Sequence, residues 1–102
     1  ERFVEGAKNV GADRIEFYTG HFAKEFKINP ENAVKAHSKA AKLANDLGLG
    51  INAGHDLNLN NLKFYKSHID GLLEVSIGHA LISDALYYGL EETIKMYLEK
   101  LN

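Results

Sequence analysis

Three histidines in this chain follow a glycine at the end of an apolar run, and each is a candidate for proton transfer or anion binding. The three stretches are Phe17-Tyr18-Thr19-Gly20-His21, Ile51-Asn52-Ala53-Gly54-His55 and Ser76-Ile77-Gly78-His79. An apolar run that gives way to Gly-His and then to a helical pattern is typical of a strand leading into a helix. Because three strand ends carry the same Gly-His pair, we expect them to assemble one site. Imidazole titrates near neutral pH, so histidines in such a site are suited to proton transfer.

The other two histidines lie away from the predicted strand ends. His37 falls within a helical pattern and His68 precedes a predicted strand. We interpret both as structural. For His55, position alone leaves a functional and a structural role open.

Two acidic residues fall within predicted strands. Glu16 alternates with Ile15 and Phe17, so its carboxylate points into the interior of a barrel if those apolar residues face surrounding helices. It would then either pair with Arg14 or another interior charge, or stabilise positive charge that develops on a substrate. By the same alternation along its strand, Glu74 also faces the interior, and we favour a structural ion pair for it.

The two glycines before His55 and His79 also have two interpretations. Gly54 and Gly78 either satisfy close packing or let a ligand approach the backbone. A zinc or iron site would suit the three histidines and Glu16, but the sequence has no His-x-His or His-Glu-x-x-His pair. We therefore do not expect a metal.

The amino-acid composition limits which partners and which cellular location we expect for the chain. The chain has 102 residues, a single-domain length, and twelve Lys and Arg against fourteen Asp and Glu give a net charge of -2. We expect neither a nucleic-acid nor a membrane partner. Cysteine is absent, no apolar run approaches the roughly 18 residues of a membrane helix, and Glu1–Glu5 does not read as a signal peptide. These features predict a cytoplasmic protein.

Hydrophobic periodicity predicts three strands separated by helices. The strands are expected at 14–19, 49–53 and 72–77, and helices at 1–10, 29–47, 80–88 and 91–101. A further short helix, capped by one of the asparagines in 57–62, is expected to run through Tyr65. Asn29-Pro30-Glu31 is a strong helix start, whereas the segment from Gly20 to Ile28 is polar and aperiodic and no element is assigned to it. In the last helix we expect an inward stripe of Leu90, Ile94, Leu98 and Leu101, and an outward pair of Glu91 with Lys95.

This order predicts an α/β fold with parallel strands in right-handed crossovers. Three parallel strands alone would leave apolar edges open, so we interpret 1–102 as one segment, the C-terminal portion of a (β/α)8 TIM barrel of about 250 residues whose earlier strands are missing. The helix Ala80–Tyr88 has the position of the extra phosphate-binding helix of such barrels. A small doubly wound domain is the alternative.

Three motifs resemble the last three strand ends of the pyridoxine 5'-phosphate synthase family. They are Ile15–Gly20, Gly50–His55 and Ser76–Ala80, and the resemblance extends over essentially all 102 residues. It implies a TIM barrel that condenses 1-deoxy-D-xylulose 5-phosphate with 3-amino-2-oxopropyl phosphate, without a metal or organic cofactor. It also implies a homo-octamer.

The resemblance assigns roles to five residues. Glu16 matches the transition-state-stabilising glutamate and His55 the proton donor, while Gly78 and His79 match positions that bind substrate phosphate. Asp56 stands where the family often has a ligand-contacting glycine, and its carboxylate would repel a phosphate unless it turns away. The family requires no histidine at His21. Because its other acid-base residues lie on earlier strands, we expect this chain alone to be inactive.

Two alternative functions remain open from the residues. One is another phosphate-binding barrel enzyme, an isomerase or an aldolase, although none of the three predicted strands supplies the lysine of a Schiff-base aldolase. The other is a non-catalytic phosphate-binding or assembly module.

Overall fold

A three-stranded parallel sheet forms the centre of the computed structural model, which describes residues 2–102. The strands β1 (Arg14–Tyr18), β2 (Gly50–Gly54) and β3 (Leu72–Ser76) lie in the order β1-β2-β3. The helices are α1 (Arg2–Asn9), α2 (Gly20–Phe26), α3 (Pro30–Asp46), α4 (Leu62–His68), α5 (His79–Tyr88) and α6 (Leu90–Leu101). The predicted parallel α/β order is confirmed, and Glu1, where the first predicted helix begins, lies outside the described residues.

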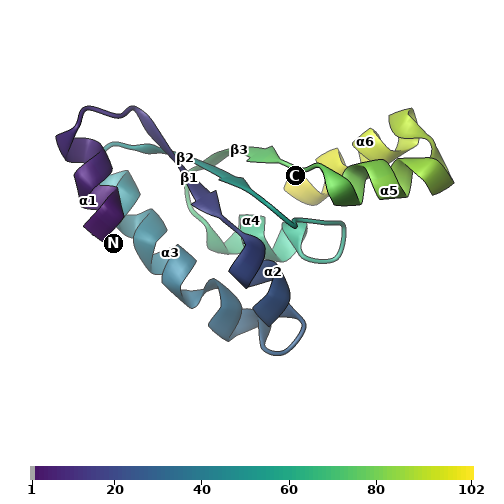
Figure 1. Ribbon diagram of the computed structural model, residues 1–102, viewed down its shortest axis with the longest axis horizontal. Helices are drawn as coiled ribbons and strands as arrows, with labels where there is room; N and C mark the ends of the chain where they lie inside the picture. Colours follow the sequence, from purple (N-terminus) through teal and green to yellow (C-terminus); the bar gives the residue numbers. More distant parts are fainter. Residues whose placement is uncertain (1) are drawn as a thin grey trace.

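The two faces of the sheet differ in polarity. Ile51 and Ala53 of β2 are fully buried and belong to the same core cluster as Ala44 of α3 and Leu62 of α4. Both helices lie on one side of the sheet (Figure 1). Ile15 and Phe17 of β1 are half-buried against the same core. The alternate residues of β1, Arg14, Glu16 and Tyr18, are polar and exposed, as expected for a strand with one covered face.

A register shift interrupts the predicted alternation of β3. Ile51 pairs with Leu72, but the next residue, Asn52, pairs with Glu74, so Leu73 is an extra residue in the ladder. As a result Leu72 is buried and Leu73 is 56% exposed. The shift also brings Glu74 into the same row as Asn52 and Glu16.

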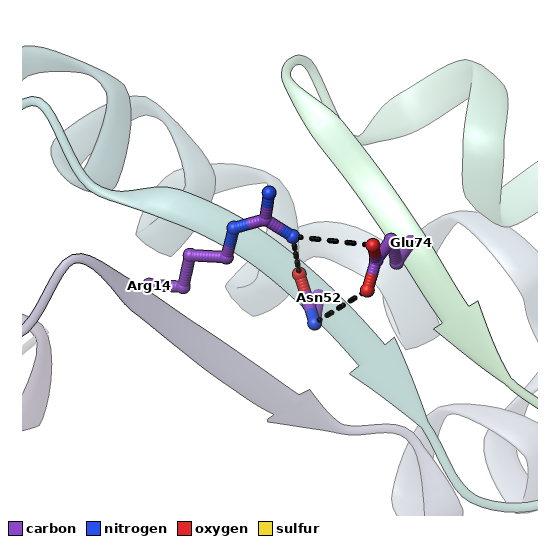
Figure 2. Close-up of polar contacts among 3 residues, drawn as sticks. All are labelled: Arg14, Asn52 and Glu74. Atoms are coloured by element: carbon purple, nitrogen blue, oxygen red, sulfur yellow. Dashed lines mark hydrogen bonds and ion pairs between the residues drawn. The ribbon is translucent and has the colours of Figure 1, made fainter.

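Polar side chains bridge the three strands on the open face of the sheet. Nη1 of Arg14 lies 3.4 Å from Oε1 of Glu74 and donates to Oδ1 of Asn52 at 3.4 Å. Figure 2 shows these side chains reaching across the three strands. The amide of Asn52 donates in turn to Oε2 of Glu74 at 3.3 Å. The predicted structural ion pair of Glu74 is therefore present, and its partner is Arg14.

The longest helix begins and ends where its sequence predicts. The side chain of Asn29 accepts a hydrogen bond from the backbone N–H of Asn32 at 3.1 Å, and Pro30 occupies the first turn. Gly48 follows the helix with φ of 76°, a conformation that glycine adopts at little cost. Val34, Ala41 and Ala44 form the buried stripe of α3.

The segment after β1 is a helix, which the sequence pattern did not reveal. In α2, Phe22 is 1% exposed, and its ring centroid lies 4.7 Å from that of Tyr65 and 5.5 Å from that of Phe26. Two phenylalanines four residues apart share one helical face, so packing against α4 stabilises this polar stretch as a helix.

Of the predicted inward stripe of the last helix, Leu101 packs against the core, but the other three residues do not. Leu90, Ile94 and Leu98 are 56%, 42% and 55% exposed, whereas Thr93 and Tyr97 are buried. Tyr97 packs into the core, and its hydroxyl donates to Asp84 of α5 at 2.8 Å, which fixes the rotation of α6. The predicted pair of Glu91 and Lys95 is present at 3.8 Å.

The helix after β2 follows an asparagine, as predicted, and extends beyond its predicted end at Tyr65. It covers Leu62–His68 because Asn58 and Asn61 form a turn before it, in which Asn61 accepts from the N–H of Asn58 at 2.8 Å. Asn58 accepts in return from the N–H of Asn61 at 3.0 Å.

Within residues 2–102, no helix has the length and apolar character needed to cross a membrane.

Candidate functional site

The three Gly-His pairs lie at one edge of the sheet. Gly20 and His21 begin α2, Gly54 and His55 end β2, and His79 begins α5 with Gly78 as its N-cap residue. Because the strands are parallel, their carboxyl ends meet at this edge. The structure therefore assembles the predicted strand ends into one region.

A cleft of about 680 Å³ opens at this edge. It includes three of the predicted site residues, Asp56, Gly78 and His79, together with His21. Its other walls come from β1, α2, the loop after β2 and α5, and the residues are Tyr18, Gly20, Ala23, Lys24, Lys27, Leu57, Asn58, Ala80 and Ser83.

The loop that carries His55 and Asp56 has an uncommon backbone. His55 has φ of 101° and Asp56 has φ of 60°, in the left-handed region that costs a non-glycine residue about 1–3 kcal/mol. The buried hydroxyl of Thr19 donates to the backbone oxygen of His55, and the side chain of Asn61 donates to that of Asp56 at 3.3 Å. These two contacts hold the loop from both sides.

The imidazole of His55 has two close neighbours. Its Nδ1 lies 3.0 Å from Oδ2 of Asp56, and both side chains are about half exposed, at 54% and 51%. Its ring centroid lies 4.7 Å from that of Tyr18. His55 thus lies beside the cleft, next to two residues that line it.

Glu16 projects from the open face of the sheet. In residues 2–102 it forms no ion pair, because Arg14 contacts Glu74 instead. A β-carbon built on Gly54 would lie 3.3 Å from Oε2 of Glu16, so this carboxylate rests against the residue that precedes His55. Glu16 is exposed here, and it does not line the cleft.

The amino terminus of α5 offers donors for an anion. The first turn of a helix has backbone N–H groups without intrahelical partners, and no side chain caps this one. The cleft is also lined by Lys24 of α2 and by Lys27, the C-cap residue of that helix, and neither forms an ion pair within residues 2–102. The cleft therefore combines helix-terminal donors with two ammonium groups.

The remaining histidines have separate environments. The ring of His21 lies 6.2 Å from that of Tyr18 in the cleft, so His21 is part of this region. His37 packs in the aromatic core, where its Nδ1 lies 2.9 Å from the hydroxyl of Tyr65; burial and, less strongly, His21 lower its pKa. His68 stacks on Phe64 with centroids 4.1 Å apart. These contacts support structural roles for His37 and His68.

Residues 2–102 contain no group of three or more His, Asp or Glu side chains that could hold a metal ion. The histidines at the cleft also have other neighbours, with His55 against Asp56 and Tyr18. The arrangement is better suited to hydrogen bonding and proton transfer.

Four residues of this region were missed from the sequence. Tyr18 lies on the same strand face as Glu16, and this alternation was a usable signal. Lys24 and Lys27 lie in and directly after α2, a helix that the sequence pattern did not reveal. Thr19 gave no signal of its own, because its partner lies 36 residues away. The roles of Glu16, His55, Asp56, Gly78 and His79 remain predictions.

Comparison with known proteins gives consistent matches along the whole chain. The model of a family described as pyridoxal phosphate biosynthesis protein PdxJ matches residues 1–102. Among curated proteins, the pyridoxine 5'-phosphate synthases of Flavobacterium johnsoniae and Cytophaga hutchinsonii are each 60% identical over 98 residues, which are 96% of this chain and 41% of theirs. That of Christiangramia forsetii is 55% identical over 101 residues, 99% of this chain and 43% of its own. The chain spans about two fifths of the length of these relatives.

Proposed function

The chain belongs to the PdxJ family, and on this basis we propose that it supplies the last three strand-helix units of a pyridoxine 5'-phosphate synthase. Its relatives carry that name, and it aligns with about two fifths of each. The open polar face of the sheet becomes the interior of a closed (β/α)8 barrel in this proposal, and α5 becomes its extra phosphate-binding helix.

The reaction we propose joins 3-amino-2-oxopropyl phosphate to 1-deoxy-D-xylulose 5-phosphate. The amine and the ketone condense to an imine, loss of water and phosphate yields alkenes, and ring closure with a further loss of water gives the aromatic product. Several of these steps need a proton delivered or removed at one position. The observation that carries the proposal is the cleft that combines Gly78, His79 and the first turn of α5 beside His55.

His55 is the proposed proton donor, and Glu16 the proposed stabiliser of cationic intermediates. The imidazole of His55 is half exposed beside the cleft, so it is accessible to a substrate oxygen. The carboxylate of Glu16 has no cation paired with it within residues 2–102, which leaves its charge available for an iminium-like substrate group.

Substrate phosphate is proposed to bind at Gly78 and His79, with the backbone N–H of Asp56 as a further donor. Gly78 has open space where a side chain would project, so a phosphate can approach its backbone. Lys24 and Lys27 add positive charge to the cleft. The proposal includes no cofactor, and it retains the expected homo-octamer and cytoplasmic location.

Incubation of the full-length protein with both substrates tests this function. We expect pyridoxine 5'-phosphate and inorganic phosphate to appear together, and neither to form when one substrate is omitted. Residues 1–102 alone should be inactive, because a barrel site needs residues from several strands. Failure of the full-length protein to form pyridoxine 5'-phosphate would favour another phosphate-binding enzyme or a non-catalytic module.

A further inference from the structure

We propose that Asp56 is a positioning residue for His55, and that its carboxylate holds the imidazole with Nδ1–H toward Asp56 and Nε2 free for a substrate. This inference rests on the proposed function, since the role of His55 as proton donor is part of it. It assigns to the Asp56 side chain a role other than the binding of phosphate.

The contact between the two side chains carries the proposal. Oδ2 of Asp56 lies 3.0 Å from Nδ1 of His55, within the range of a hydrogen bond from imidazole to carboxylate. Nε2 of His55 has no hydrogen-bond partner within residues 2–102. The ring of Tyr18, with its centroid 4.7 Å away, restricts the imidazole from another side. One nitrogen is thus engaged and the other is available.

The backbone brings adjacent side chains into this contact. His55 and Asp56 both have positive φ, at 101° and 60°, and such conformations persist where surrounding contacts determine them. Thr19 holds the backbone oxygen of His55, and Asn61 holds that of Asp56 at 3.3 Å. The loop is therefore fixed from the residue after β1 and from the turn before α4, in the conformation that the pair requires.

The pairing also accounts for an acid in a cleft that we propose for anions. An isolated carboxylate beside a phosphate would be repelled by it. When His55 is an imidazolium, the negative charge of Asp56 is compensated by its immediate neighbour. The backbone N–H of Asp56 then stays available to the phosphate, while its side chain serves the imidazole.

The proton step follows from this arrangement. The imidazolium gives its Nε2 proton to a substrate oxygen, so the N–H bond breaks and an O–H bond forms as that oxygen is protonated. The electron pair of the broken bond stays on Nε2. The neutral ring retains its hydrogen on Nδ1, where Asp56 accepts it, and Nε2 takes a new proton from water before the next donation.

Kinetics of Asp56→Gly and Asp56→Asn in the full-length protein provide the first test. Glycine accepts the positive φ without strain but leaves Nδ1 without a partner, so we expect kcat to fall about tenfold with KM for either substrate within about twofold. The asparagine side chain keeps a neutral acceptor oxygen, so Asp56→Asn should retain more activity than Asp56→Gly. Asp70→Asn removes the same charge from the turn before β3 and serves as the matched control.

The tautomer of His55 provides a readout that does not depend on activity. In protein labelled with ¹⁵N-histidine, the nitrogen shifts of neutral His55 should report hydrogen on Nδ1 in the wild type, and a shift toward the Nε2–H form in Asp56→Gly. An unchanged tautomer, an unchanged kcat, or a raised KM with normal kcat would overturn the proposal. If the wild type forms no pyridoxine 5'-phosphate, the proposed function fails, while the tautomer still decides whether Asp56 orients His55.

Discussion

The carboxylate of Glu16 rests against Gly54, because a β-carbon added at Gly54 would lie only 3.3 Å from Oε2 of Glu16. The same β-carbon would lie 3.2 Å from the β-carbon of Ser76 on β3. Gly54 therefore provides the space in which the proposed stabilising carboxylate lies between two strands.

Replacement of Gly54 by alanine should displace this carboxylate. We expect Gly54→Ala in the full-length protein to lower kcat about tenfold and to destabilise the fold by about 1–3 kcal/mol, since the added methyl group meets packed atoms. Turnover assays and urea unfolding measure the two effects. Gly6→Ala is the control: nothing lies within 4 Å of its added β-carbon, so it should raise the stability of α1 by about 1 kcal/mol. Normal turnover in Gly54→Ala would contradict the role of this spacing.

Replacement of His55 by asparagine separates proton donation from loop geometry. Asparagine tolerates positive φ better than most residues, so His55→Asn should preserve the backbone at φ of 101°. We expect kcat to fall by about a hundredfold to ten-thousandfold with little change in KM, because an amide does not act as a general acid. Steady-state kinetics with both substrates measure this, with His68→Asn as the control. Near-normal turnover would defeat the assignment of His55.

Neutralisation of two lysines tests the electrostatic part of the cleft. We expect the double variant Lys24→Gln, Lys27→Gln to raise KM for the phosphorylated substrates about tenfold, if each exposed charge contributes about 0.7 kcal/mol. The difference from wild type should shrink at high ionic strength. The variant Lys42→Gln, Lys63→Gln removes two exposed lysines outside the cleft as a control. Equal effects of both double variants would show that general charge, and not the cleft, determines KM.

Local sequence signals predicted the elements that local contacts stabilise. Asn29 and Pro30 mark the start of α3 because a cap and a first-turn proline act within four residues of each other. In α2, by contrast, Phe22 stabilises the helix by packing against Tyr65, a residue far along the chain. The hydrophobic periodicity of this short polar segment could not indicate that packing partner, so the helix was not predicted.

The polar contacts of the sheet depended on register, which the sequence did not determine. Arg14 and Glu16 share a strand face, so the sequence allowed a pair between them. The register shift at Leu73 instead brings Glu74 to 3.4 Å from Arg14. The contact of Thr19 with His55 likewise needs β1 and β2 to be neighbours. The sequence therefore suggested the residues proposed for the site, but it did not indicate the contacts that support them.

The buried environment of His37 predicts that acid destabilises the fold. Burial, and to a lesser extent His21, lower the pKa of His37 in the folded state, whereas the unfolded value is about 6.5. As pH falls below about 6.5, the unfolded chain takes up a proton that folded His37 resists, so the free energy of unfolding decreases. This stabilising contribution is present above the unfolded pKa and is lost as pH falls through the lower folded pKa.

Urea unfolding of the full-length protein between pH 5 and pH 8 measures this dependence. His37→Gln removes the titrating group and can still hydrogen-bond to the hydroxyl of Tyr65, so we expect a weaker decrease in stability toward pH 5 than in the wild type. His68→Gln tests whether loss of any histidine has the same effect. An unaltered pH dependence in His37→Gln would assign the acid sensitivity to another group, because no proton uptake would then be linked to His37.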